Sequence, residues 1–252
     1  MDVGYILGHQ AEYEELRYSL RSLRVFSHDK VYIAGAPPPD WSVGLHHIPV
    51  EQASLEGRGE PGNRWWSNRK TNMRRNLLAL LDSEEVSDEF LYMNDDFILT
   101  RPPGPVPHLG TFVETHKGKM DKKQGPYVDL YHWFQDKGVD PVHVSEHVPM
   151  VVDNRLAGMM REVWDITGFP YASLWGNLTD TPTVKSQSGD WVLNHARDHS
   201  ETWPDEWWSA STVSNSFHVW PVGGKIRGLH PDPSPYENPD FPVPVNPPPS
   251  YP

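Results

Sequence analysis

The chain has 252 residues, 37% of which are hydrophobic, and a formal net charge of −12. This length is typical of one large domain with a substantial core, and the negative charge disfavours nucleic acid as a partner. The absence of cysteine excludes disulfide frameworks and cysteine-ligated zinc sites.

The first fifty residues alternate between strand and helix patterns. Residues 2–8 are a short apolar run closed by glycine, which predicts a buried strand. Residues 12–23 place apolar side chains three or four positions apart, which predicts a helix with one buried face. Further strands are expected over residues 30–35 and 45–50. This order is the opening of an α/β fold.

The rest of the chain has fewer regular patterns. A helix is expected over residues 65–82 and a buried strand over residues 89–93. The later predictions are a cap followed by a helix over residues 146–165, a short helix over 189–199, and a strand or loop over 209–226. Residues 231–252 contain ten prolines, so they are expected to form an extended tail that either wraps the body or is disordered.

The expected location is the cytoplasm. No apolar run approaches the roughly 18–20 residues of a membrane span. The first ten residues lack the charged and apolar regions of a signal peptide.

Two adjacent carboxylates, Asp95 and Asp96, follow the predicted buried strand. In open α/β sheets, ligands bind outside the carboxyl ends of the strands. Adjacent like charges favour a cation, and oxygen ligands suit Mg²⁺ or Mn²⁺. The alternative is a polar turn that joins two strands. The spacing alone leaves both interpretations open.

Two basic clusters precede the acidic pair. Arg17 lies in a stripe of arginines along the first predicted helix, and Asn68 with Arg69 lies near the start of the second. Basic side chains and helix N-termini both suit phosphate. The alternative is a solvated helix face paired with nearby glutamates for the first cluster, and a solvated helix end for the second. The sequence alone favours this alternative for both clusters.

His147 lies just before a predicted helix, where an imidazole can act as a general base. The chain has 13 histidines, so an ordinary surface or core role is the alternative for any one of them.

The order of four motifs resembles the Stealth family of sugar-1-phosphate transferases, which act in microbial capsule synthesis. The motifs are "ELRYSLRSL", "KVYIAGAPPPDW", "FLYMNDDFILTRP" and "HVPMVVD". The resemblance is scattered over roughly residues 2–195. A looser similarity, in size, layout and the "HPDPSPYE" stretch, links the chain to short glycosyltransferase-like proteins of actinobacterial phages.

The Stealth resemblance implies a role for several residues. Asp95 and Asp96 would bind the metal and the donor diphosphate. His147 would deprotonate the acceptor, and Asp190 would lie near the donor sugar; with Asp96 these are the expected catalytic residues. The expected substrate-binding residues are Arg17, Asn68, Arg69, Asn94 and Lys185. The chain departs from the family after its first strand, where "LGHQAEY" lacks the family's acidic turn.

The resulting prediction is an α/β, Rossmann-like fold of the nucleotide-sugar transferase (GT-A-like) type. Residues 1–110 would form the nucleotide-sugar-binding core, residues 111–230 an aromatic-rich acceptor-side half, and residues 231–252 the tail. The expected partners are a nucleotide-sugar donor and a glycan, protein or modified-DNA acceptor, with Mg²⁺ or Mn²⁺ as cofactor.

Two other functions stay open. One is a DNA-modifying glycosyltransferase of a phage, which would act in the host cytoplasm. The other is a catalytically inactive module of the same fold that binds a glycan or a nucleotide.

Overall fold

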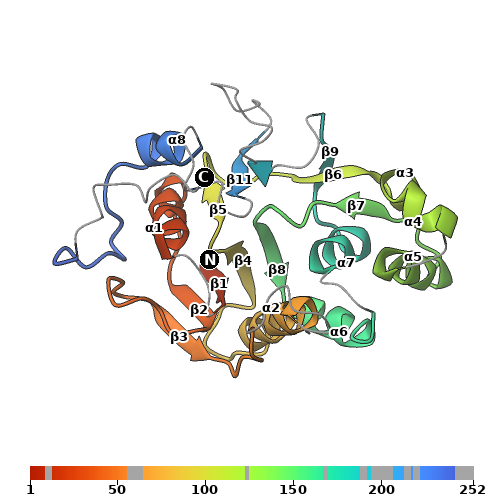
Figure 1. Cartoon of the computed structure of the whole chain (residues 1–252), viewed down its shortest axis with the longest axis horizontal. Coiled ribbons are helices and arrows are strands. Elements are labelled where there is room, and N and C mark those ends of the chain that lie inside the picture. Colours follow the sequence, from red (N-terminus) through yellow and green to blue (C-terminus); the bar gives the residue numbers. More distant parts are fainter. Residues whose placement is uncertain are drawn as a thin grey trace.

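Figure 1 shows the computed structural model of the chain. It describes residues 1–8, 13–55, 65–122, 125–166, 170–187, 192–193, 207–212, 217 and 222–241. Among these residues, no helix has the length and apolar character needed to cross a membrane.

A five-stranded sheet forms the centre of the fold. Its strand order is β3-β2-β1-β4-β8. The strands are β1 (Asp2–Leu7), β2 (Val31–Gly35), β3 (His46–Pro49), β4 (Glu89–Asn94) and β8 (Met150–Asp153). The first four are parallel, and β8 runs antiparallel to β4. All residues of β1 and β2 are buried, as expected for parallel strands covered on both faces.

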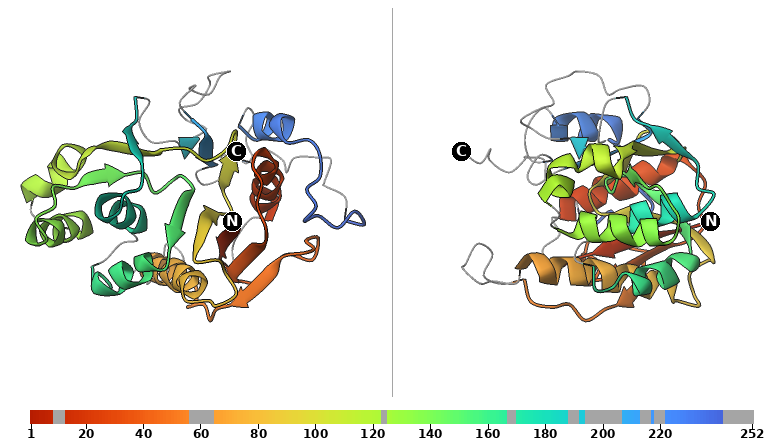
Figure 2. Two further views of the ribbon diagram at one scale, coloured as in Figure 1. Left: turned by 180° about the vertical axis from the view of Figure 1, so that it is seen from behind. Right: turned by 90° about the vertical axis from the view of Figure 1, so that its right-hand side faces the viewer.

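Helices cover both faces of this sheet. Helix α2 (Trp65–Leu81) packs against β1 and β2, whereas α1 (Tyr13–Ser22) lies on the opposite side, as two views show (Figures 1 and 2). The short 3₁₀ helix η1 (Leu23–Val25) continues α1. The apolar face predicted for residues 12–23 is confirmed, because Leu16 and Leu20 of α1 and Leu23 of η1 are at most 1% exposed.

Two smaller sheets complete the structure. One has the order β10-β11-β5, with β5 (Phe97–Leu99), β10 (Val192–Leu193) and β11 (Ser209–Thr212). The other has the order β7-β6-β9, with β6 (Val106–Thr111), β7 (Val142–Val144) and β9 (Thr183–Lys185). The remaining helices are α3 (Phe112–Thr115), α4 (Lys117–Lys122), α5 (Pro126–Asp136), α6 (Arg155–Glu162), α7 (Tyr171–Leu178) and α8 (Val222–Leu229).

Three sequence-based predictions need correction. Residues 150–153, within the stretch predicted as a cap followed by a helix, form the edge strand β8. This strand has four residues, which is too short for an alternating pattern to be recognised. Residues 192–193, predicted as helix, form β10. Residues 222–229, partly predicted as strand or loop, form α8 despite three glycines. Glycine has a low helix propensity, but tertiary packing requires it at Gly223. A Cβ at this position would lie 1.8 Å from the Phe217 carbonyl oxygen.

The described part of the predicted tail, residues 231–241, wraps the body. Glu237 accepts hydrogen bonds from Arg21 Nε at 2.7 Å and Nη2 at 2.8 Å. Backbone bonds also join Val43 N to the Tyr236 oxygen at 2.9 Å and Asn238 N to the Trp41 oxygen at 2.7 Å. The central sheet likewise takes β8 from the predicted second half, so the two predicted halves share one sheet.

Candidate active site

The acidic pair lies where the chain leaves the central sheet. β4 ends at Asn94 and β5 begins at Phe97, so Asp95 and Asp96 form the two-residue link between them. β5 pairs with β11 instead of β4. The link is therefore not a hairpin turn. It carries the chain from the carboxyl edge of one sheet into another, which is where open α/β sheets bind ligands.

The environment of the pair disfavours two negative charges. Both side chains are half-buried. Burial and the adjacent Asp96 raise the pKa of Asp95 well above the usual range. Burial also raises the pKa of Asp96, although a 2.6 Å hydrogen bond from Ser211 Oγ to Asp96 Oδ2 acts in the opposite direction. A bound cation would relieve this electrostatic cost.

Strand register brings His147 to the same edge. Tyr92 of β4 lies opposite Met150 of β8, so antiparallel β8 begins near the point where β4 ends. His147 lies three residues before β8, and its imidazole is close enough to lower the pKa of Asp96. The His147 backbone N–H donates to Ser145 Oγ at 3.2 Å. A general-base candidate thus lies beside the acidic pair.

Arg69 also lies near the pair. In a parallel crossover, the connecting helix begins at the carboxyl edge of the sheet, and α2 follows β3 in this way. Arg69 lies in the second turn of α2, and its positive charge lowers the pKa of both Asp95 and Asp96. The sequence-predicted residues Asp95, Asp96, His147 and Arg69 therefore form one group.

Asn68 belongs to a row of asparagines on α2 that holds neighbouring loops. Asn68 Nδ2 donates to the Ser54 oxygen at 2.8 Å. One turn later, Asn72 exchanges two hydrogen bonds with the Ala53 backbone, at 2.8 and 3.0 Å. One turn further, Asn76 Nδ2 donates to the Leu7 oxygen at the end of β1, at 3.1 Å. This row fixes two segments at the carboxyl edge of the sheet.

Other predicted residues have different surroundings. Arg17 is buried against the C-terminal segment, with Nη1 3.4 Å from Glu237 Oε2 and the guanidinium carbon 4.4 Å from the centre of the Trp41 ring. Asn94 Oδ1 accepts a 2.8 Å hydrogen bond from the Tyr92 hydroxyl. Lys185 is exposed on β9; burial lowers the pKa of His108, and the charge of Lys185 lowers it further. These contacts do not join Arg17 or Lys185 to the acidic pair, and Asp190 lies outside the described residues.

Polar groups that no sequence-based prediction included hold the link in place. On the inner face of α1, Ser19 Oγ donates to the Phe97 oxygen at 2.5 Å, and Ser22 Oγ accepts from Leu99 N at 3.0 Å. Glu15, on the same face, accepts from Thr212 Oγ1 at 2.5 Å. The spacing i, i+4, i+7 of these three α1 residues was the available signal. The arginine stripe on the same helix obscures this pattern in the sequence.

The residues present fit a divalent cation. Among the described residues, no three or more histidine, aspartate or glutamate side chains gather in a way that could hold a metal by themselves. Mg²⁺ commonly uses one or two carboxylates and completes its shell with substrate phosphates and water. Asp95 and Asp96 supply that number of carboxylates.

No protein-family model and no curated protein matches the sequence. The fold is nevertheless similar to that of the galactosyltransferase LgtC in complex with donor and acceptor sugar analogues, with a TM-score of 0.53 and 11% identity over 97% of this chain and 98% of the other. An active-site mutant of LgtC gives a TM-score of 0.51 at 11% identity, over 91% and 95% of the two chains. This likeness confirms the predicted α/β, Rossmann-like, GT-A-like fold.

Proposed function

We propose that the chain is a nucleotide-sugar-dependent transferase that acts on an acceptor hydroxyl. The observation that carries the proposal is the link Asp95–Asp96 at the carboxyl end of β4, with His147 and Arg69 beside it. The fold of LgtC supports a nucleotide-sugar donor, since that galactosyltransferase was solved with donor and acceptor sugar analogues.

In the proposed reaction, the acceptor oxygen attacks the anomeric carbon of the donor sugar. The imidazole of His147 takes the proton of the acceptor hydroxyl. The bond between the anomeric carbon and the diphosphate breaks, and its electron pair leaves with the nucleoside diphosphate. Asp95 and Asp96 would hold Mg²⁺ or Mn²⁺, which when bound neutralises charge on the diphosphate. Arg69 adds a positive charge at the same place.

The motif order that resembles the Stealth family supports a variant of this reaction. There the acceptor oxygen attacks the phosphorus that carries the sugar, the bond within the diphosphate breaks, and the nucleoside monophosphate leaves. The same four residues serve either reaction, because both place negative charge on the leaving phosphate.

The leaving group distinguishes the two reactions and tests the proposal. The full chain is incubated with Mn²⁺ or Mg²⁺, a panel of nucleotide sugars and a bacterial lysate as acceptor source, and the products are identified by mass spectrometry. Nucleoside diphosphate release means sugar transfer, and monophosphate release means sugar-1-phosphate transfer. A double variant with Asp95→Ala and Asp96→Ala should release neither.

Two outcomes would overturn the proposal. Donor binding without either product in the wild type would favour an inactive binding module. Full activity in the double variant would remove the carboxylates from the mechanism.

A further inference from the structure

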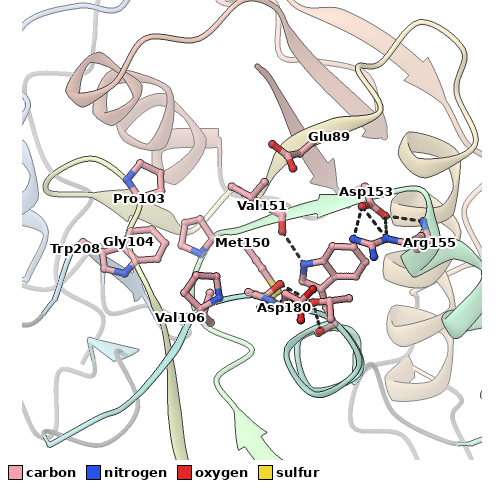
Figure 3. Close-up of a pocket in the computed structure, with 15 residues that line it drawn as sticks. Glu89, Pro103, Gly104, Val106, Met150, Val151, Asp153, Arg155, Asp180 and Trp208 are labelled. Atoms are coloured by element: carbon pink, nitrogen blue, oxygen red, sulfur yellow. Dashed lines mark hydrogen bonds and ion pairs between the residues drawn. The ribbon is translucent and has the colours of Figure 1, made fainter.

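A concave site lies along the outer edge of β8, and neither residue of the acidic pair lines it. It is a cavity of about 290 Å³, bounded by β8, the loop around Gly104 and the end of α7 (Figure 3). Asp153 and Arg155 lie at one end, and Trp208 lies beside Pro103 and Gly104 at the other. The volume is just below the roughly 300–1,000 Å³ range of ligand pockets.

Two fixed indole rings contribute to the walls. Trp175 Nε1 donates to the Val151 oxygen at 2.8 Å, and Trp208 Nε1 donates to the Pro105 oxygen at 2.9 Å. Each ring therefore has its polar atom satisfied by backbone, and carbon atoms of each ring form part of the cavity wall. Since both rings are 3% exposed, they are held firmly by the surrounding core.

The polar lining is mostly acidic. Arg155 binds Asp153 through Nε, at 3.0 and 2.9 Å to the two carboxylate oxygens, and this pair is internally neutral. Glu89 and Asp180 are exposed carboxylates that also line the cavity. Three acidic groups against one basic group disfavour a phosphate or a nucleotide here. Carboxylates are strong acceptors for hydroxyl hydrogens.

This combination matches one chemical class. A sugar ring has carbon-bound hydrogens that pack on aromatic faces and hydroxyls that donate to carboxylates. A small cavity with apolar walls and a few polar groups is the usual form of a small-molecule site. The cavity volume suits one sugar unit, and the acidic lining suits a neutral or amine-bearing sugar.

The position of the cavity relates it to the acceptor. Its lining includes Pro149 and Met150, which follow His147 closely in the chain. The end of the cavity at Asp153 reaches Glu89, at the start of β4. Asp95 and Asp96 follow the opposite end of that strand. Six residues of strand span about 17 Å, so a ligand at the Glu89 end cannot reach the donor diphosphate.

We propose that this cavity binds a sugar unit of the acceptor, at a distance from the hydroxyl that reacts. The identification of this sugar as part of an acceptor rests on the proposed transferase function. The binding of a sugar in the cavity does not depend on that function. An acceptor longer than one sugar would lie along β8, with its reacting end beside His147 and a more distant unit in the cavity.

Saccharide binding without any donor provides the test. Calorimetric titration of the full chain uses lactose, cellotriose, maltotriose and chitotriose at millimolar concentration. The test variant combines Glu89→Gln and Asp180→Asn, which removes both exposed carboxylates of the cavity and preserves side-chain size. The matched control combines Asp136→Asn and Asp140→Asn, two exposed carboxylates outside the cavity.

The wild type and the control should bind at least one of these saccharides, and the test variant should bind it about fivefold or more weakly, as expected for lost hydrogen bonds to charged groups. Because the titration contains no donor, saccharide binding is measured independently of turnover, and donor turnover into water by the wild type and the control variant reports separately on the proposed function. Equal saccharide affinity in test and control variants, or no binding of any saccharide by the wild type, would overturn the inference.

Discussion

Ser211 donates a 2.6 Å hydrogen bond to Asp96 across 115 positions of sequence, and this bond fixes one carboxylate of the acidic pair. The neighbouring Thr212 N–H donates to the Asp96 carbonyl oxygen at 3.1 Å. Strand β11 therefore holds both the backbone and the side chain of Asp96, so β11 sets the direction in which this carboxylate points.

Replacing Ser211 with alanine should weaken Mn²⁺ binding by about tenfold, because a hydrogen bond to a charged group contributes about 1.5–3 kcal/mol. Paramagnetic resonance of free Mn²⁺ measures this directly. Ser209→Ala is the matched control, since Ser209 lies in the same strand, is buried, and has no hydrogen-bond partner for its hydroxyl among the described residues. Equal Mn²⁺ affinity in the two variants would show that β11 does not orient the carboxylate.

Replacing Asp95 with asparagine should stabilise the metal-free protein. Burial and the adjacent Asp96 make the ionised form of Asp95 costly in the fold. The neutral amide removes the repulsion, so the melting temperature measured with a chelator should rise by a few degrees. The same variant should lose the stabilisation that Mn²⁺ gives the wild type. A lower melting temperature in chelator would mean that another group already balances the Asp95 charge.

The raised pKa of Asp95 also predicts opposite pH trends for the fold and for metal binding. The folded protein binds the proton of the Asp95 carboxyl group more tightly than the unfolded chain, in which the pKa of an aspartate is about 3.9. The contribution of Asp95 to metal-free stability is therefore complete below that pH and is lost as the pH rises through the raised value. Mn²⁺ competes with the proton, so its affinity should increase over the same range. Chemical unfolding and Mn²⁺ titration at several pH values measure both trends, and parallel trends would contradict the assignment.

The site shows which features a sequence can predict. The buried strand before Asp95 and the helix that carries Arg69 follow from local periodicity, and both were predicted. The sequence marks His147 as a candidate base by its place before a predicted helix and by the family resemblance, but its proximity to Asp96 depends on the register of β8, which no local pattern shows. Ser211 could not be identified at all. Its partnership with Asp96 exists only after β11 pairs with β5, and no local pattern specifies which strands of two separate segments will pair.

Replacing His147 with glutamine should slow transfer by about 10²–10⁴-fold, the usual contribution of a general base. Donor binding should change little, because the acidic pair and Arg69 remain. Rapid quench of a single turnover separates the two steps. His132→Gln, at an exposed position of α5, is the control and should be fully active. An unchanged single-turnover rate in the His147 variant would assign proton removal to another group.

Arg17 offers a choice between a structural role and the substrate role that the family resemblance implies. Arg17 and Arg21 share Glu237, with all three side chains at most 6% exposed. Removing Glu237 would leave two buried cations unpaired, so Glu237→Ala should lower the free energy of unfolding by about 3–5 kcal/mol. Arg24→Ala breaks the exposed pair with Asp232 and should cost at most about 1 kcal/mol.

The decisive comparison is Arg17→Ala against Glu237→Ala, each assayed for stability by denaturant and for donor affinity at a temperature where both are folded. A structural Arg17 predicts that both variants lose stability, that the double variant loses less than the sum of the two, and that donor affinity is unchanged. A substrate-binding Arg17 predicts weaker donor binding in Arg17→Ala alone. The 3.4 Å contact with Glu237 and the Trp41 ring over the guanidinium favour the structural result, because both contacts already stabilise the Arg17 cation within the fold.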